Sequence, residues 1–179
     1  MSAAEALSIR GAYLLHGSTS TDERGRFSRQ VDLGLLRTTV DDPEAAYVAS
    51  AHNIQRGTVR GLHYQDAPHE EAKTLWCESG SVYDVLVDVR PSEPTYLTWI
   101  SVELTDAEPV ALHVPKGVAH GYQTTSDDST LVYLISTPYE PASARTISWR
   151  DPALGISWPL EVTSISDRDA GAPFLGDVP

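Results

Sequence analysis

Cysteine is nearly absent from this chain, and so are the signs of an exported or membrane protein. Cys77 is the single cysteine among 179 residues, which excludes an internal disulfide and a zinc site made of several cysteines. Because it stands in an apolar run, we expect it to be buried as a small hydrophobe. No apolar run approaches the roughly 18 residues of a membrane span, and the N-terminus lacks a basic start before a long apolar core. These absences predict no export, no membrane partner and a cytoplasmic location.

Positive charge is also scarce. Lys and Arg number 13 against 25 Asp and Glu, which gives a formal net charge of −12 at pH 7. Such a chain has no general electrostatic attraction for nucleic acid or for an anionic membrane, so an anionic ligand must be held by a local group of cations. The length and the 41% hydrophobic content fit one domain with a sizeable core. We expect a single domain over residues 1–179, with residues 1–8 as a flexible start.

The signatures of several enzyme classes are missing. There is no G-x-S-x-G elbow, no phosphate loop and no dinucleotide fingerprint, and Cys77 has no evident activating neighbour. His69 and Glu71 do not have the usual spacing of a carboxylate–histidine metal site, so we expect neither a metal nor a cofactor. The remaining chemistry is acid–base catalysis by His, Lys, Tyr and Asp, with Arg positioning an anion.

Short β-type segments recur along the chain with turn signals between them. We predict strands over residues 11–15, 46–51, 74–77, 82–89, 96–102, 110–114, 122–125, 131–136 and 146–149. A polar turn is expected through residues 18–29, and a helical turn or two over residues 31–37. No segment shows a long 3.6-residue period. This pattern favours an all-β protein, a sandwich or barrel of the jelly-roll type with short helical pieces.

Two segments carry more specific expectations. Along Val82–Val89, one face bears Val82, Asp84, Leu86 and Asp88, and the other bears Tyr83 and three valines. The second face is more core-like, so Asp84 is expected to face a polar cavity, although a purely structural role is equally compatible. The Trp- and Pro-rich tail over residues 149–159 is expected to pack across the sheets as irregular structure.

A dense group of functional side chains lies between residues 60 and 73, between two segments predicted as strands. Arg60, His63 and Lys73 bring a guanidinium, an imidazole and an ammonium together within fifteen residues. A site for an anionic substrate needs such groups. The residue types alone equally allow two solvated charges and a core histidine.

The motifs, taken in order, resemble the dTDP-4-dehydrorhamnose 3,5-epimerases and related nucleotide-sugar epimerases. The similarity runs from residue 22 to residue 173, and its specific stretches are Arg60–Gln65, the Lys73 segment, Asp84–Arg90, Val114–Tyr122 and Asp151–Ile156. Within them, Pro115–His120 also has the P-x-G-x-x-H spacing of half a cupin barrel, whereas His63-Tyr64-Gln65 lacks the second histidine of metal-binding cupins. The resemblance implies a cofactor-free epimerase on a cupin-type jelly-roll barrel that works as a homodimer. Its substrate would be a nucleotide-linked 4-keto-6-deoxyhexose, with dTDP as the expected nucleotide.

The resemblance also assigns roles to residues. His63 would be the general base, Asp169 would orient it, and Tyr133 would return the proton from the opposite face of the sugar. Lys73 would lie near the C4 oxygen and stabilise the enolate, while Arg24 and Arg60 would anchor the diphosphate. The other expected substrate contacts are Phe27, Arg29, His120 and Tyr139.

Four positions depart from the family pattern and leave the substrate open. Arg29 stands where many members carry a Glu, and Arg26 replaces an aromatic residue; Val48 and Ser50 occupy positions of a Gln and an Asn. These changes leave undecided the nucleotide, the sugar, and whether one or both of C3 and C5 are inverted. A sugar ketoisomerase on a similar barrel and a non-catalytic sugar-binding cupin are the alternatives. The joint presence of His63, Tyr133 and Asp169 favours the epimerase.

Overall fold

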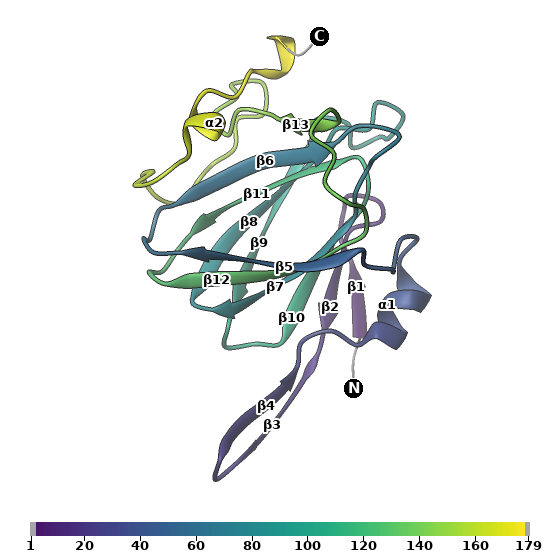
Figure 1. The fold of residues 1–179 in the computed structure, drawn as a ribbon, viewed down its shortest axis with the longest axis vertical. Helices are drawn as coiled ribbons and strands as arrows, with labels where there is room; N and C mark the ends of the chain where they lie inside the picture. Colours follow the sequence, from purple (N-terminus) through teal and green to yellow (C-terminus); the bar gives the residue numbers. More distant parts are fainter. Residues whose placement is uncertain (1–2, 178–179) are drawn as a thin grey trace.

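Two antiparallel sheets face each other and enclose the interior of the protein (Figure 1). The structure, a computed structural model, describes residues 3–177. This arrangement confirms the predicted all-β jelly roll. The flexible start expected over residues 1–8 lies partly outside the described residues, and Ala3–Ala6 forms the edge strand β1.

The first sheet has six strands in the order β1-β2-β10-β7-β12-β5. Its strands are β1 (Ala3–Ala6), β2 (Tyr13–His16), β10 (Val110–Val114), β7 (Lys73–Ser79), β12 (Ser129–Ile135) and β5 (Tyr47–Asn53). Helix α1 (Leu33–Thr39), where the sequence predicted a helical turn or two, packs Leu36 against the outer face of this sheet. Asp32 caps α1, because its side chain accepts hydrogen bonds from the amides of Gly34 and Leu35. Within residues 3–177, no helix is long and apolar enough to cross a bilayer.

The second sheet has five strands in the order β13-β6-β11-β8-β9. They are β13 (Ala144–Thr146), β6 (Val59–Gln65), β11 (Val118–Thr124), β8 (Ser81–Asp88) and β9 (Trp99–Thr105). The stretch Arg60–Gln65 therefore lies within a central strand. The sequence predicted strands on either side of this stretch, at β5 and β7, but not β6 itself, because its small and charged residues do not show the usual alternation of a strand.

A third pair of strands forms a hairpin that projects away from both sheets (Figure 1). Its strands are β3 (Ser18–Asp22) and β4 (Gly25–Arg29), with Ser18 opposite Arg29 and Asp22 opposite Gly25. The sequence predicted only a polar turn here. Nearly all hairpin side chains are exposed, so the segment has no buried face and no apolar alternation to reveal it.

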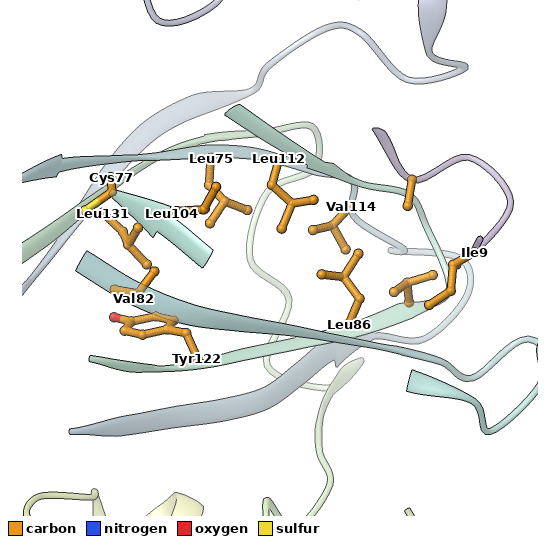
Figure 2. Packing of buried hydrophobic residues seen from close by; sticks show 12 residues of the cluster. Ile9, Leu75, Cys77, Val82, Leu86, Leu104, Leu112, Val114, Tyr122 and Leu131 are labelled. Carbon is orange, nitrogen blue, oxygen red and sulfur yellow. The ribbon is translucent and has the colours of Figure 1, made fainter. Parts of the chain in front are cut away.

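Apolar side chains fill one part of the space between the sheets (Figure 2). Leu75, Leu112 and Leu131 come from the six-stranded sheet, and Val82 and Leu86 come from β8 of the other sheet. Asp84 is fully buried. Because side chains alternate along a strand, it lies on the same inward face as Val82 and Leu86.

The opposite face of β8 is buried as well, beneath the C-terminal tail. Val85 and Val87 pack there with Leu154 and Trp158. This contact confirms that the tail packs across a sheet as irregular structure. The face with Val85 is thus apolar and buried, as expected, but it lies outside the barrel, and the face with Asp84 lines the interior together with Val82 and Leu86.

Cys77 lies in the core as predicted, with 1% of its surface exposed. Its thiol donates hydrogen bonds to the carbonyl oxygens of Ser79 and Gly80. Burial raises the pKa of the Cys77 thiol to about 12. The thiol therefore stays protonated and unreactive at physiological pH.

Gly61 allows β6 and β11 to approach closely beside the polar part of the interior. Its φ is +125°, and a Cβ atom there would lie 2.5 Å from the Cα of Gly121 and 3.0 Å from the carbonyl oxygen of His120. The pairing of these strands places His63 opposite His120. The position of both imidazoles thus depends on a glycine at residue 61.

Gly61→Ala is expected to lower the free energy of unfolding by about 3 kcal/mol or more, because both the backbone conformation and the contact become unfavourable. Gly25 is a matched control: it has the same φ of +125°, and a Cβ atom there would have no other atom within 4 Å. Gly25→Ala should cost only the backbone part, about 1–2 kcal/mol. Urea unfolding measures both values, and equal losses would show that the close approach at Gly61 is unimportant.

Candidate active site

A cavity of about 290 Å³ lies between the two sheets, and it is lined by both of them. Strands β6 and β11 contribute from one side, and β5, β7 and β12 contribute from the other. Six of the residues predicted from the sequence line it: Arg60, His63, Lys73, His120, Tyr133 and Tyr139. The fold thus gathers side chains that are up to 79 positions apart, from Arg60 to Tyr139.

His63 and Asp169 form a hydrogen-bonded pair at this cavity. Nε2 of His63 lies 2.7 Å from Oδ1 of Asp169, and the other carboxylate oxygen accepts from the amide of Gly61 at 3.3 Å. Burial alone would raise the pKa of Asp169, but the hydrogen bond and charge of His63, together with the hydrogen bonds to Gly61 and Ser166, outweigh it, so the pKa is lowered. An ionised carboxylate requires a proton on Nε2, which leaves the lone pair of Nδ1 on neutral His63 free to accept another.

The C-terminal tail holds Asp169 in place. After crossing the outer face of the five-stranded sheet, the tail pairs with the start of β6, where the amide of Val59 donates to the carbonyl of Ser164 at 2.9 Å. The short helix α2 (Asp167–Ala170) follows, and the Ser166 hydroxyl accepts from the amide of Asp169 at 3.2 Å. These contacts bring a carboxylate from the end of the chain to a histidine near its first third.

Lys73 carries a nearly buried ammonium at the cavity wall. Its Nζ lies 3.0 Å from Oε1 of Glu71 and donates to the carbonyl oxygen of His63 at 3.3 Å. Only 8% of the Lys73 side chain and 10% of the Glu71 side chain are exposed. The ammonium is therefore fixed both to a carboxylate and to the backbone of His63.

Tyr133 stands on β12, in the sheet opposite the one that carries His63. Burial, with smaller contributions from the charges of neighbouring groups, raises the pKa of the Tyr133 phenol well above its ordinary value of 10.0. The hydroxyl of Tyr122 is among the neighbouring groups that raise this pKa. The Tyr133 phenol therefore remains protonated at neutral pH and is able to donate a proton.

A short network continues from Tyr122 to the mouth of the cavity. The Tyr122 hydroxyl donates to Oδ1 of Asn53 at 3.2 Å, and Nε of Arg60 donates to the same oxygen at 2.8 Å. Asn53 is itself fixed, because its amide nitrogen donates to the carbonyl oxygens of Ala51 and Ser129. The network ties the orientation of Arg60 to Tyr122 through Asn53.

A second imidazole–carboxylate pair lies behind Tyr133. Nε2 of His120 is 3.0 Å from Asp84, and the rings of His120 and Tyr133 meet edge to face with centroids 6.2 Å apart. Burial raises the pKa of Asp84, against the opposing effect of His120. Asp84 was expected to face a polar cavity; it does not line the cavity itself, but it contacts His120, which does.

Three predicted substrate contacts lie elsewhere. Arg24, Phe27 and Arg29 belong to the projecting hairpin, and none of them lines the cavity of the described chain. Arg24 forms an ion pair with Asp22 at 2.6 Å, and Phe27 is 71% exposed. A single chain therefore does not bring these residues to its own site.

The chain is similar to known proteins along nearly its whole length. A family model described as dTDP-4-dehydrorhamnose 3,5-epimerase matches residues 6–177. A dTDP-4-dehydrorhamnose 3,5-epimerase of Sinorhizobium fredii is 37% identical over 98% of this chain and 90% of its own length.

The chain belongs to the dTDP-4-dehydrorhamnose 3,5-epimerase family. It is therefore an isomerase. Two solved structures of related enzymes contain dTDP-sugars. A Legionella pneumophila 3,5-epimerase in complex with dTDP-4-keto-L-rhamnose has a TM-score of 0.92 and 29% identity, and the match covers 100% of this chain and 95% of the other. A Streptomyces bikiniensis 3'-monoepimerase in complex with dTDP-quinovose has a TM-score of 0.88 and 35% identity, with coverages of 95% and 86%.

In this epimerase-family chain, the cavity also contains residues that the sequence did not single out for it. Arg168 lines the cavity, and its side chain makes no hydrogen bond or ion pair with any other residue in the range 3–177. Arg145 lines it too, but forms an ion pair with Asp66 at 2.6 Å. The sequence offered one signal that Arg168 belongs to the site, which is its position next to Asp169. It offered no such signal for Arg145.

The two side chains weighed as metal ligands are engaged with other groups. His69 Nδ1 lies 2.9 Å from the Ser143 hydroxyl, and Glu71 contacts Lys73. Across the described part of the chain, no three His, Cys, Asp or Glu side chains come together as a metal site.

Asp169→Asn tests the electrostatics of the histidine pair. Because the pKa of Asp169 lies below its ordinary value of 3.8, the carboxylate stabilises the fold above about pH 4, and this contribution is lost as the pH falls through the lowered pKa. The variant should lose about 1–3 kcal/mol at pH 6, and its difference from the wild type should shrink towards pH 3. Urea unfolding at both pH values measures this, with the exposed Asp167→Asn as the control. A difference that stays constant with pH would contradict the assignment.

Proposed function

We propose that this isomerase inverts C3, C5 or both in a dTDP-linked 4-keto-6-deoxyhexose, as a step of deoxysugar biosynthesis. The observation that carries the proposal is the placement of His63 and Tyr133 on facing sheets at one cavity. Inversion at a carbon requires a base on one face of the sugar and an acid on the other. The dTDP-sugars bound to the two related enzymes support the choice of substrate.

His63 takes the proton from the carbon beside the C4 ketone. Its Nδ1 accepts that proton, while the ionised Asp169 holds the proton on Nε2 and stabilises the imidazolium that forms. The electrons of the broken C–H bond move to the C4 oxygen. Lys73 stabilises the resulting enolate with a fixed, nearly buried ammonium.

Tyr133 gives a proton to the opposite face of the same carbon. Its raised pKa keeps the phenol protonated until the enolate, a stronger base, is present. The products of one turnover are the inverted sugar, an imidazolium at His63 and a phenolate at Tyr133. Both side chains return to their starting states by exchanging one proton with water.

The nucleotide end of the substrate is assigned to Arg60 and Arg168. At the cavity, His63, Lys73 and His120 each have a carboxylate partner, whereas Arg60 is hydrogen-bonded to neutral Asn53 and Arg168 has no partner among the described residues. Excess positive charge is thus confined to these two guanidiniums, which suits a diphosphate. Tyr139 is 55% exposed at the cavity and offers an aromatic face to the sugar or the base.

Solvent exchange tests the reaction directly. The protein is incubated in D2O with dTDP-4-keto-6-deoxyglucose, and NMR follows deuterium uptake at each sugar position. His63→Ala should reduce exchange to background, because the variant lacks the proposed base. Tyr133→Phe should retain part of the exchange but invert the carbon at least about 100-fold more slowly, because reprotonation then lacks its acid.

Two variants on exposed residues serve as controls. His52→Ala and Tyr96→Phe alter side chains outside the cavity and should leave the rate unchanged. Uptake at C3 and C5 identifies a double epimerase, and uptake at one position identifies a narrower one. Full activity of His63→Ala would refute the base assignment; binding without any exchange in the wild type would favour a sugar-binding protein.

We further propose a homodimer in which the hairpin of one subunit completes the cavity of the other. The hairpin projects away from both sheets (Figure 1) and has few contacts with them. It carries Arg24 and Phe27 in exposed positions. Its reach explains how residues expected to bind substrate can lie away from their own cavity. Arg24 would then add a cation to the Arg60 and Arg168 of its partner.

Mixing two inactive variants tests this arrangement. Arg24→Ala keeps His63, and His63→Ala keeps Arg24, so a mixed dimer has one cavity with both residues. After joint refolding of equal amounts, about a quarter of the cavities should be complete, and D2O exchange should return to about a quarter of the wild-type rate. If Arg24 acts in its own subunit, the mixture will show no more exchange than the average of the separate variants.

A further inference from the structure

Glu71 places a carboxylate inside the cavity without a role in the reaction described above. It precedes β7 and lies two residues before Lys73, so that both side chains point to the same side of an extended chain. Its Oε1 contacts Nζ of Lys73 at 3.0 Å, and both side chains are about nine-tenths buried. The contact is therefore a shielded ion pair at the cavity wall.

Two groups of the protein hold the ammonium of Lys73. The carboxylate of Glu71 forms an ion pair with it at 3.0 Å, and the carbonyl oxygen of His63 accepts one of its three N–H bonds at 3.3 Å. A free N–H bond remains for a substrate oxygen, and the two contacts limit the directions in which it can point.

We propose that Glu71 is a positioning residue, which aims the free N–H bond of Lys73 at the C4 oxygen of the substrate. The inference rests on the proposed function and adds to it the group that directs the enolate-stabilising cation. The second acceptor is the backbone of the base itself, so the ammonium is held in a fixed relation to His63. Without these contacts the flexible side chain of Lys73 would occupy several rotamers.

The carboxylate has a second effect, on the charge of the site before substrate binds. Burying an ammonium without a counter-ion costs free energy. The charge of Lys73 also acts on the pKa of Asp84, but that carboxylate already contacts His120. Glu71 neutralises Lys73 within the wall, and this leaves Arg60 and Arg168 as the cations that attract the substrate. The positioning effect of Glu71 and the effect of its charge can be separated by comparing two variants. Glu71→Gln keeps the shape of the side chain without the charge, and Glu71→Ala removes both.

The chain provides its own control, because it contains only two lysines, Lys73 and Lys116. Lys116 forms the equivalent ion pair with Asp42 at 2.8 Å, but there both side chains are more than one-third exposed and neither lines the cavity. Asp42→Ala therefore removes a carboxylate from the other lysine. It should change neither kcat nor KM.

The kinetic test compares Glu71→Ala with Glu71→Gln in the solvent-exchange assay. Glu71→Ala removes the acceptor and should lower kcat by about 10–100-fold with KM changed less than about threefold, since a misplaced cation impairs the transition state more than binding. Glu71→Gln keeps an acceptor oxygen and should retain at least about a third of the wild-type kcat. If Glu71→Ala keeps its kcat, or if Glu71→Gln is impaired as strongly as Glu71→Ala, the positioning role is refuted.

An activity-independent measurement uses protein labelled with 15N-lysine. An ammonium held in a shielded ion pair exchanges its protons slowly with water and gives a side-chain 1H–15N signal, and Lys116→Arg identifies which signal belongs to Lys73. Glu71→Ala should shift and broaden the Lys73 signal, whereas Asp42→Ala should affect the Lys116 signal alone. An unchanged Lys73 signal in Glu71→Ala would overturn the inference.

The outcomes separate this inference from the function on which it rests. A wild-type protein that exchanges no sugar proton refutes the epimerase, whatever the lysine signals show. A wild-type protein that exchanges normally, together with a fully active Glu71→Ala variant, refutes the role of Glu71 alone.

Discussion

The hydrogen bond between His63 and Asp169 is the contact on which the rest of the site depends. It joins residues 106 positions apart, so both the barrel and the tail must be in place before it forms. The tail packs Leu154 and Trp158 over the outer face of β8, pairs Ser164 with the start of β6, and then presents Asp169 from a short capped helix. The apolar contacts that bury this outer face thereby also set the proton on Nε2 of the histidine.

The two ends of the cavity differ in how many of their cations are paired with carboxylates. Next to the proposed sugar position, the imidazoles and the ammonium each contact a buried carboxylate, so that this end has little net charge. Arg60 and Arg168 lack such partners among the described residues. A chain with a net charge of −12 can therefore attract an anion locally, because its acidic groups neutralise some cations and leave two others unmatched.

The fold class could be predicted from the sequence, because turn signals and β-branched runs are local features. The family could be predicted because its motifs occur in order along the chain. His63, Lys73, Tyr133 and Asp169 were expected near one another, and the structure brings them to one site, although their chemical roles stay predictions. The hairpin was missed because exposed polar strands have no alternation. Arg168 and the contact of Glu71 with Lys73 were missed because a lone charge next to a motif does not reveal which way its side chain points.

The position of Cys77 has a practical consequence for following the projecting hairpin. Its thiol is buried, donates to two backbone carbonyls and stays protonated, so maleimides and other thiol reagents will not modify it in the folded protein. A cysteine introduced at the exposed turn of the hairpin would be the one reactive thiol of the chain. A fluorophore could then be attached there without removing the native cysteine, and energy transfer between two labelled chains would report how closely their hairpins approach.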